Sequence, residues 1–340
     1  MSNKASRPWE YALDVESLAL PVSFSLFVAG IAGYFGGVSL MAFVLMLLAA
    51  VCLQLSANLA RAYGDIVDRE SVRRDYYERK FAQYKMRKEL DPVAATAGNL
   101  LAMQLRTMLI ATTAMGLVLG YAFIMTSFGM DVSSTAADAI PFARQWMAFA
   151  LYAVVVALVL LRYLGTWRHG YRVYGNIILF VLVGGCAAGC FYLLAHAFVF
   201  VAIYPSIGIG ALAVAIANMR DISRMGTDSE LRQSNRSRRT VPLALRFEGA
   251  LMLQVVAVIL AMVWLLVFPI MMDAPFIWNY AFVLFYIPLV RELVMLRSIK
   301  PSGVARAKRA LALASIFLSA AWLFSLAASN LSLAFMLFVL

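Results

Sequence analysis

Two polar stretches interrupt an otherwise apolar chain, and their residue types suit a divalent cation or a phosphate. The first runs over residues 58–70 and contains Asp65 and Asp68, which a helix would place on one face because they are three residues apart. Asn58 would lie two turns before Asp65. Carboxylate and amide oxygens are hard ligands that suit Mg²⁺. A solvated helix end with snorkelling charges has the same spacing, so both interpretations stay open.

The second stretch contains Asn218, Arg220 and Asp221, and the basic pair Arg238 and Arg239 follows it. An aspartate beside arginines suits a Mg²⁺–diphosphate, because guanidinium forks match phosphate oxygens and Mg²⁺ binds one or two carboxylates together with substrate phosphates. An ordinary basic loop beside a membrane is the equal alternative.

A third, shorter stretch runs over residues 171–176. Its Arg172 is a candidate contact for an anion. The tyrosines Tyr171 and Tyr174 on either side favour instead an anchor at the level of the lipid headgroups, when this stretch is considered alone.

The elements that must position these residues are membrane-spanning helices. Of the 340 residues, 63% are hydrophobic and only 14% are charged, far from the balance of a soluble domain. The 29 Lys and Arg residues outnumber the 18 Asp and Glu residues. They lie between the apolar runs, so membrane topology explains them and we expect no nucleic acid partner.

The apolar runs predict an all-α polytopic membrane protein of nine transmembrane helices in a single domain, residues 1–340. About 20 helical residues cross a bilayer, and each run is long enough or nearly so. The predicted spans are 18–36, 38–61, 98–128, 144–163, 176–197, 199–219, 243–270, 276–296 and 308–338.

Basic residues gather in alternate loops, which predicts the orientation of the chain in an inner (cytoplasmic) membrane. The basic loops are 62–97, 164–175, 220–242 and 297–307. Since cytoplasmic loops carry the excess of Lys and Arg, the N-terminus is predicted to be cytoplasmic and Leu340 to lie outside. The two largest loops, 62–97 and 220–242, would then carry the site.

Taken together, four segments resemble the UbiA superfamily of intramembrane prenyltransferases. Within it the chain is most similar to the 1,4-dihydroxy-2-naphthoate polyprenyltransferases of menaquinone biosynthesis. The segments are residues 55–65, residues 170–175, residues 218–222 and the basic-basic-Thr element at residues 238–240.

This resemblance implies a UbiA-like bundle around a central cavity and a Mg²⁺-dependent enzyme. The enzyme would move a polyprenyl group from polyprenyl diphosphate to an aromatic acceptor, 1,4-dihydroxy-2-naphthoate, within the lipid bilayer. Asp65 and Asp221 would be catalytic, and Asp65, Asp68 and Asp221 would hold Mg²⁺. The diphosphate contacts implied are Asn58, Arg172, Asn218, Arg220, Arg238 and Arg239.

Several acidic positions of the family pattern are missing, which leaves a second hypothesis. Arg61 and Ala62 replace the leading Asn-Asp pair of the family's first motif, Arg69 stands at its last acidic position, and Met225 replaces an aspartate of the second motif. Metal ligands supply much of the charge stabilisation in such a reaction. The alternative is therefore a non-catalytic UbiA-like relative that binds prenyl lipid.

Overall fold

The computed structural model describes the residues of the chain from 17 onward in several stretches. They are 17–35, 38–83, 92–129, 140–164, 168–195, 200, 203–225, 240–271, 307–316 and 319–320. Within these stretches every regular element is a helix. The prediction of an all-α chain is therefore confirmed for the part of the chain that the structure describes.

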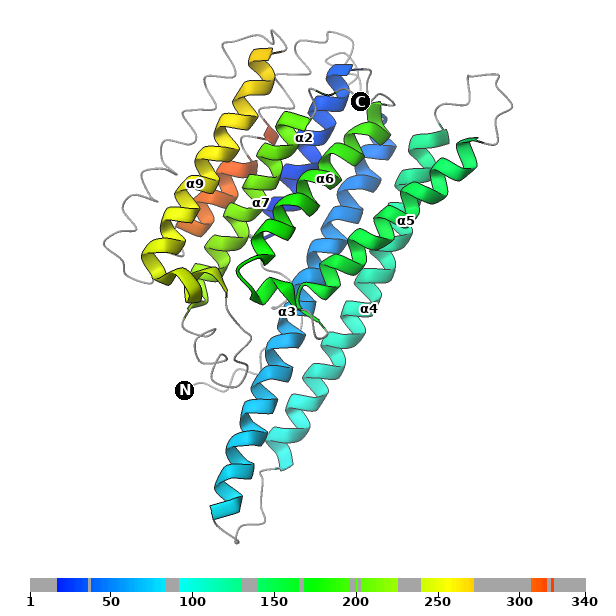
Figure 1. Ribbon diagram of the computed structural model, residues 1–340. Coiled ribbons are helices and arrows are strands. Elements are labelled where there is room, and N and C mark those ends of the chain that lie inside the picture. Colours follow the sequence, from blue (N-terminus) through cyan, green and yellow to red (C-terminus); the bar gives the residue numbers. More distant parts are fainter. Residues whose placement is uncertain are drawn as a thin grey trace.

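The helices run roughly antiparallel in one bundle (Figure 1). Helix α7 lies at the centre of the bundle, because 83% of the residues in its apolar, membrane-crossing stretch are buried. Helices α6 and α9 pack along it. Helices α3, α4 and α5 form the other side of the bundle, and α2 packs between α3 and α6. The elements are α2 (Ala19–Phe35), α3 (Leu40–Gln83), α4 (Pro92–Gly129), α5 (Ile140–Leu161), the 3-10 helix η1 (His169–Tyr171), α6 (Gly175–Ala195), α7 (Ile203–Ser223) and α9 (Val241–Met271).

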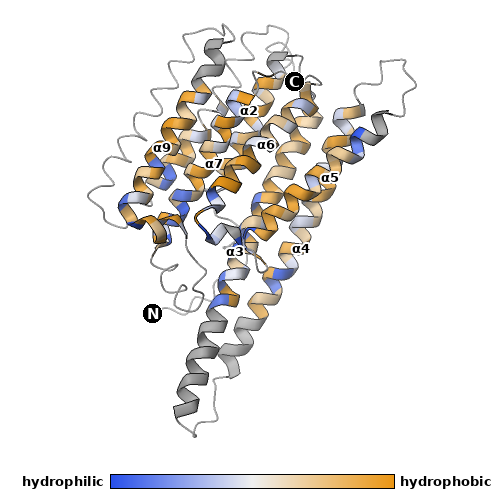
Figure 2. Ribbon diagram, viewed as in Figure 1, coloured by the Kyte–Doolittle hydropathy of each residue, from blue (hydrophilic) through white to orange (hydrophobic). Residues whose placement is uncertain are grey.

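Six of these helices, α3 to α7 and α9, are long and apolar enough to cross a membrane. Large apolar side chains such as Val118, Met147 and Val181 are exposed on their outer faces, as lipid-facing helices require. In Figure 2 apolar residues cover the body of the bundle, and polar residues gather near the ends of α7 and α9. The chain is an integral membrane protein.

Seven of the nine predicted spans coincide with described helices, α2 included. The predicted span 276–296 lies outside the described residues, and the span 308–338 is described only at 307–316 and 319–320, which are helical. The count of nine therefore stays a prediction.

The predicted loop 62–97 was placed wrongly, because most of it is helix. Helix α3 continues to Gln83 and α4 begins at Pro92. At 1.5 Å per residue, the 44 residues of α3 span about 66 Å, so α3 and α4 extend past the other helices (Figure 1). The apolar pattern ends near residue 61, but Arg, Glu, Lys and Gln are good helix formers, so the helix continues where the membrane span ends.

Small residues and polar bonds bring the helices together, as is usual in membranes. A Cβ on Gly210 of α7 would lie 2.7 Å from the backbone oxygen of Phe180 on α6, so only glycine permits this approach. The Ser56 hydroxyl on α3 donates to Thr112 Oγ1 on α4 at 3.0 Å. The Tyr152 hydroxyl on α5 donates to the carbonyl of Gly116 on α4 at 2.7 Å.

Candidate functional site: a buried arginine cluster

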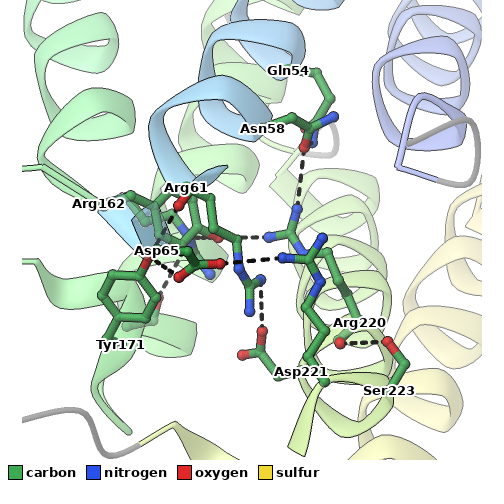
Figure 3. Close-up of polar contacts among 12 residues, drawn as sticks. Gln54, Asn58, Arg61, Asp65, Arg162, Tyr171, Arg220, Asp221 and Ser223 are labelled. Carbon is green, nitrogen blue, oxygen red and sulfur yellow. Dashed lines mark hydrogen bonds and ion pairs between the residues drawn. The ribbon is translucent and has the colours of Figure 1, made fainter. Parts of the chain in front are cut away.

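Three segments far apart in the sequence meet at one end of the bundle. They are residues 58–68 in the middle of α3, residues 162–164 and 168–171 between α5 and α6, and residues 220–224 at the end of α7. Figure 3 shows their side chains converging from different helices.

The phenol of Tyr163 lies at the centre of this meeting point, just beyond the end of α5. Its hydroxyl oxygen accepts hydrogen bonds from Arg162 Nε at 3.0 Å and from Arg220 Nη2 at 2.6 Å. The guanidinium carbons of Arg61, Arg162 and Arg220 lie 5.5, 5.5 and 5.9 Å from the ring centroid, within cation–π range. All three arginines and the tyrosine are buried. We call Arg61, Arg162 and Arg220 the arginine triad.

The charge around Tyr163 changes the acidity of its phenol. Burial alone would raise its pKa, because it disfavours the charged phenolate. The positive charges of Arg162, Arg220 and Arg61 outweigh burial and lower the pKa of Tyr163 from 10 to about 8. The centre of the site therefore favours a negative charge.

Each of the three aspartates in the meeting segments contacts an arginine. Arg61 Nη1 lies 3.0 Å from Asp221 Oδ1, and both side chains are buried. Arg168 Nη1 lies 2.6 Å from Asp68 Oδ1. Asp65 accepts a hydrogen bond from the Tyr171 hydroxyl at 2.9 Å. Its other oxygen lies 3.6 Å from Arg224 Nη1.

The turn after α5 can fold against α3 because two glycines leave room for it. The backbone nitrogen of Gly170 donates to the carbonyl of Arg162 at 2.8 Å, and a Cβ on Gly170 would lie 2.7 Å from that same oxygen. On α3, a Cβ on Gly64 would lie 3.0 Å from the backbone oxygen of Tyr163 and 3.2 Å from the hydroxyl of Tyr171. Because neither glycine has a side chain, Tyr163 and Tyr171 can approach α3 closely.

The structure brings together five of the residues that the sequence singled out: Asn58, Asp65, Asp68, Arg220 and Asp221. Asn58 joins the two predicted stretches directly, since its Oδ1 accepts a hydrogen bond from Arg220 Nη1 at 3.3 Å. The roles predicted for these residues in binding and catalysis stay predictions.

The other four residues predicted to contact the diphosphate are not among those brought together here. The Asn218 amide faces α9 and donates to the carbonyl of Ala250 at 2.9 Å and to Gln254 Oε1 at 3.1 Å. The Arg172 guanidinium lies 5.7 Å from the centroid of the Tyr174 ring. Arg238 and Arg239 lie outside the described residues.

Sequence reasoning missed most of the arginines that build the site. The sequence predicts a membrane span that ends with Arg162 and Tyr163, and it places Arg168 and Arg224 in basic loops. Arg61 stands out only as a departure from a family pattern. A signal was present, because Arg61 and Arg162 both border apolar runs where a charge is costly to bury without a partner.

In this arrangement the carboxylates do not fit a dedicated Mg²⁺ site. Each of the three aspartates is already engaged by a guanidinium. Among the described residues, no three Asp, Glu, His or Cys side chains lie close enough together to hold a metal ion. The groups that face one another here are arginines, and these suit an anion.

Comparison with known proteins gives one structural similarity of note. No protein-family model matches the chain, and no curated protein matches its sequence. Among solved structures, the chain is similar to a UbiA homolog from Archaeoglobus fulgidus bound to DMAPP and Mg²⁺. The TM-score is 0.47 at 15% sequence identity, and the match covers 89% of this chain and 97% of the other.

Proposed function

We propose that this protein is a membrane prenyltransferase that moves a polyprenyl group from polyprenyl diphosphate to an aromatic acceptor. The observation that supports the proposal is the buried arginine triad, which lies where the two predicted stretches meet. A cluster of guanidiniums suits a diphosphate, and the apolar helices beside it suit an isoprenoid chain. The segments of the sequence that resemble the UbiA superfamily support the same function.

The reaction needs charge stabilisation at the diphosphate more than any other contribution. The allylic carbon–oxygen bond breaks and the diphosphate leaves with the electron pair. A carbon of the electron-rich acceptor ring then forms the new bond to the allylic carbon, and the ring loses a proton. Guanidiniums fixed by Tyr163 and Asn58 would stabilise the charge on the leaving diphosphate without having to reorganise.

The proposed acceptor is 1,4-dihydroxy-2-naphthoate, which would place the enzyme in menaquinone biosynthesis. The proposed architecture is the full set of nine helices around a central cavity, with the arginine cluster facing the cytoplasm. The resemblance of the sequence supports these finer assignments.

A turnover assay tests the proposal. Protein in lipid nanodiscs is incubated with labelled prenyl diphosphates of several chain lengths, with and without Mg²⁺, together with 1,4-dihydroxy-2-naphthoate or a hydroxybenzoate. We expect a labelled, lipid-soluble product with the naphthoate. Product with the hydroxybenzoate alone would correct the acceptor and keep the reaction.

The second candidate function is a non-catalytic protein that binds prenyl lipid. The observation that favours it is that Asp65, Asp68 and Asp221 are all engaged within the protein. Binding of a prenyl diphosphate without turnover of any acceptor, with or without Mg²⁺, would select this alternative.

A further inference from the structure

The arginine cluster carries more positive than negative charge. Five guanidiniums and three carboxylates take part in its described contacts, so two positive charges remain in excess when all are ionised. The arginines are Arg61, Arg162, Arg168, Arg220 and Arg224, and the aspartates are Asp65, Asp68 and Asp221. Buried charge of one sign is costly unless a partner of the other sign is bound. The cluster therefore fits a multiply charged anion.

Each of the three carboxylates that could coordinate a metal ion contacts a guanidinium instead. To coordinate a cation, Asp221 would have to leave Arg61, which lies 3.0 Å away in a buried ion pair. That separation is unfavourable, because it leaves a buried guanidinium without its counter-charge. An anion can instead add to the guanidiniums while each carboxylate stays where it is.

Arg220 keeps a donor for such an anion. Its Nη1 donates to Asn58 and its Nη2 to Tyr163. Its Nε is buried and has no hydrogen-bond partner within the described part of the chain. Buried donors nearly always have a partner, and a guanidinium edge is a favoured contact for phosphate oxygens.

The cluster also has an open side. The arginine triad is buried, whereas the side chains of Arg168 and Arg224 are 22% and 39% exposed. Arg168 and Arg224 thus add positive charge on the more exposed side of the cluster. Positive charge on that side attracts an anion from solution.

We propose that the cluster binds the diphosphate of the prenyl donor through guanidiniums alone, so that donor binding needs no divalent cation. The inference rests on the proposed function, because the donor is the same molecule. Arginine is suited to this task since it stays charged and presents donors in a fixed fork. Here the guanidiniums supply the charge neutralisation that a metal ion provides at other diphosphate sites.

Calorimetric titration tests the inference directly. Inorganic pyrophosphate and farnesyl diphosphate are titrated into the full chain in nanodiscs of zwitterionic lipid, once with EDTA and once with Mg²⁺. We expect affinities in EDTA within about threefold of those in Mg²⁺, a difference below one kcal/mol. Binding that occurs only with Mg²⁺ would overturn the inference and leave the proposed function standing. Absence of binding of both probes in both conditions would overturn both.

Conservative arginine variants add a second test. Arg220→Lys keeps the charge but loses the fork, so we expect pyrophosphate affinity in EDTA to fall about tenfold. Arg144→Lys is the matched control, because Arg144 is exposed at the opposite end of α5, and its affinity should match wild type. Equal affinity of the two variants, with thermal unfolding unchanged, would contradict the inference.

The variant Asp68→Asn distinguishes binding through guanidiniums from binding through a metal ion, because the two predict opposite changes in pyrophosphate affinity. The change removes the negative charge that lies 2.6 Å from Arg168 Nη1, so guanidinium binding predicts that pyrophosphate affinity rises about threefold. A metal-ligand role for Asp68 predicts the opposite, a loss of affinity in Mg²⁺. A fall in affinity would therefore count against the inference.

Discussion

Two arginines of this site, Arg162 and Arg220, are held by hydrogen bonds to one phenol and one carboxamide. Tyr163 accepts hydrogen bonds from Arg162 and Arg220, and Asn58 accepts a further one from Arg220. Since a guanidinium side chain has many rotamers, such anchors remove much of the entropy that would otherwise oppose binding. The residues that fix the arginines matter as much as the arginines themselves.

Replacement of Tyr163 by phenylalanine should remove an ionisation near pH 8. The phenol of Tyr163 has its pKa lowered to about 8 by Arg162, Arg220 and Arg61, against the effect of burial. A titration of phenolate absorbance should therefore contain a component near pH 8 in the wild type that is missing in Tyr163→Phe. Identical titrations would contradict the described surroundings of the phenol.

The same shift predicts how stability depends on pH. An acid whose pKa is lower in the folded state stabilises the fold progressively as pH rises from the folded to the unfolded pKa. Between about pH 8 and about pH 10, the wild type should thus gain stability relative to Tyr163→Phe. Thermal unfolding in nanodiscs at several pH values measures the difference, and a constant difference would contradict the prediction.

The buried Arg61–Asp221 pair should show strong coupling. Removal of one partner leaves a buried charge without compensation, so Asp221→Ala should destabilise the fold by about 3–5 kcal/mol. The double variant Arg61→Met, Asp221→Ala should lose much less than the sum of the single variants. Unfolding in mixed micelles measures the cycle. Additive losses would mean that the two side chains do not interact.

At the scale of elements, the approach of the turn to α3 depends on a glycine. A Cβ on Gly64 would lie 3.0 Å from the backbone oxygen of Tyr163, closer than such contacts normally are. The turn would have to shift, and the tyrosine that anchors the arginines would shift with it. The helix and the turn are therefore fitted to each other at this position.

Gly64→Ala should lower the unfolding temperature and weaken pyrophosphate binding severalfold. Its matched control is Gly185→Ala on α6, where an added Cβ meets nothing within 4 Å. Since alanine favours a helix over glycine by about 1 kcal/mol, Gly185→Ala should be neutral or stabilising. Equal effects of the two variants would show that helix propensity, and not the contact with the turn, determines the changes in unfolding temperature and affinity.

The sequence predicted the helices well, but it missed how far α3 extends beyond its membrane span. Apolar runs locate membrane spans because the bilayer demands them, and this located seven described helices. It could not show that α3 continues to Gln83, since a helix in water needs no apolar pattern. It likewise indicated Asn58, Asp65 and Asp221, yet it assigned arginines such as Arg168 only to basic loops, because their partners lie far away in the sequence.

At the scale of the whole molecule, the site lies where several helices end on one side of an apolar bundle. The ends of α5 and α7 and the beginning of α6 meet the middle of α3 there. Arg144 lies at the opposite end of α5. The positive-inside rule predicts that the cluster faces the cytoplasm.

Cysteine labelling should reveal this orientation. In a variant whose native Cys52, Cys186 and Cys190 are alanine, Ser223→Cys should react with an impermeant maleimide only from the cytoplasmic side. Arg144→Cys should react only from the other side. Both positions are exposed in the structure. Labelling of both from one side would contradict the antiparallel arrangement, and exchange of the two sides would reverse the predicted orientation.

The net positive charge of the arginine cluster also affects how readily protons and small cations leak across the bilayer. A buried polar cluster at the end of a helical bundle lowers the cost for protons and small cations to enter the bilayer. Fixed guanidiniums raise an electrostatic barrier to cations at such a cluster, as arginines do in selective pores. The same residues that attract a phosphate would thus keep the membrane sealed against the ions that carry its potential.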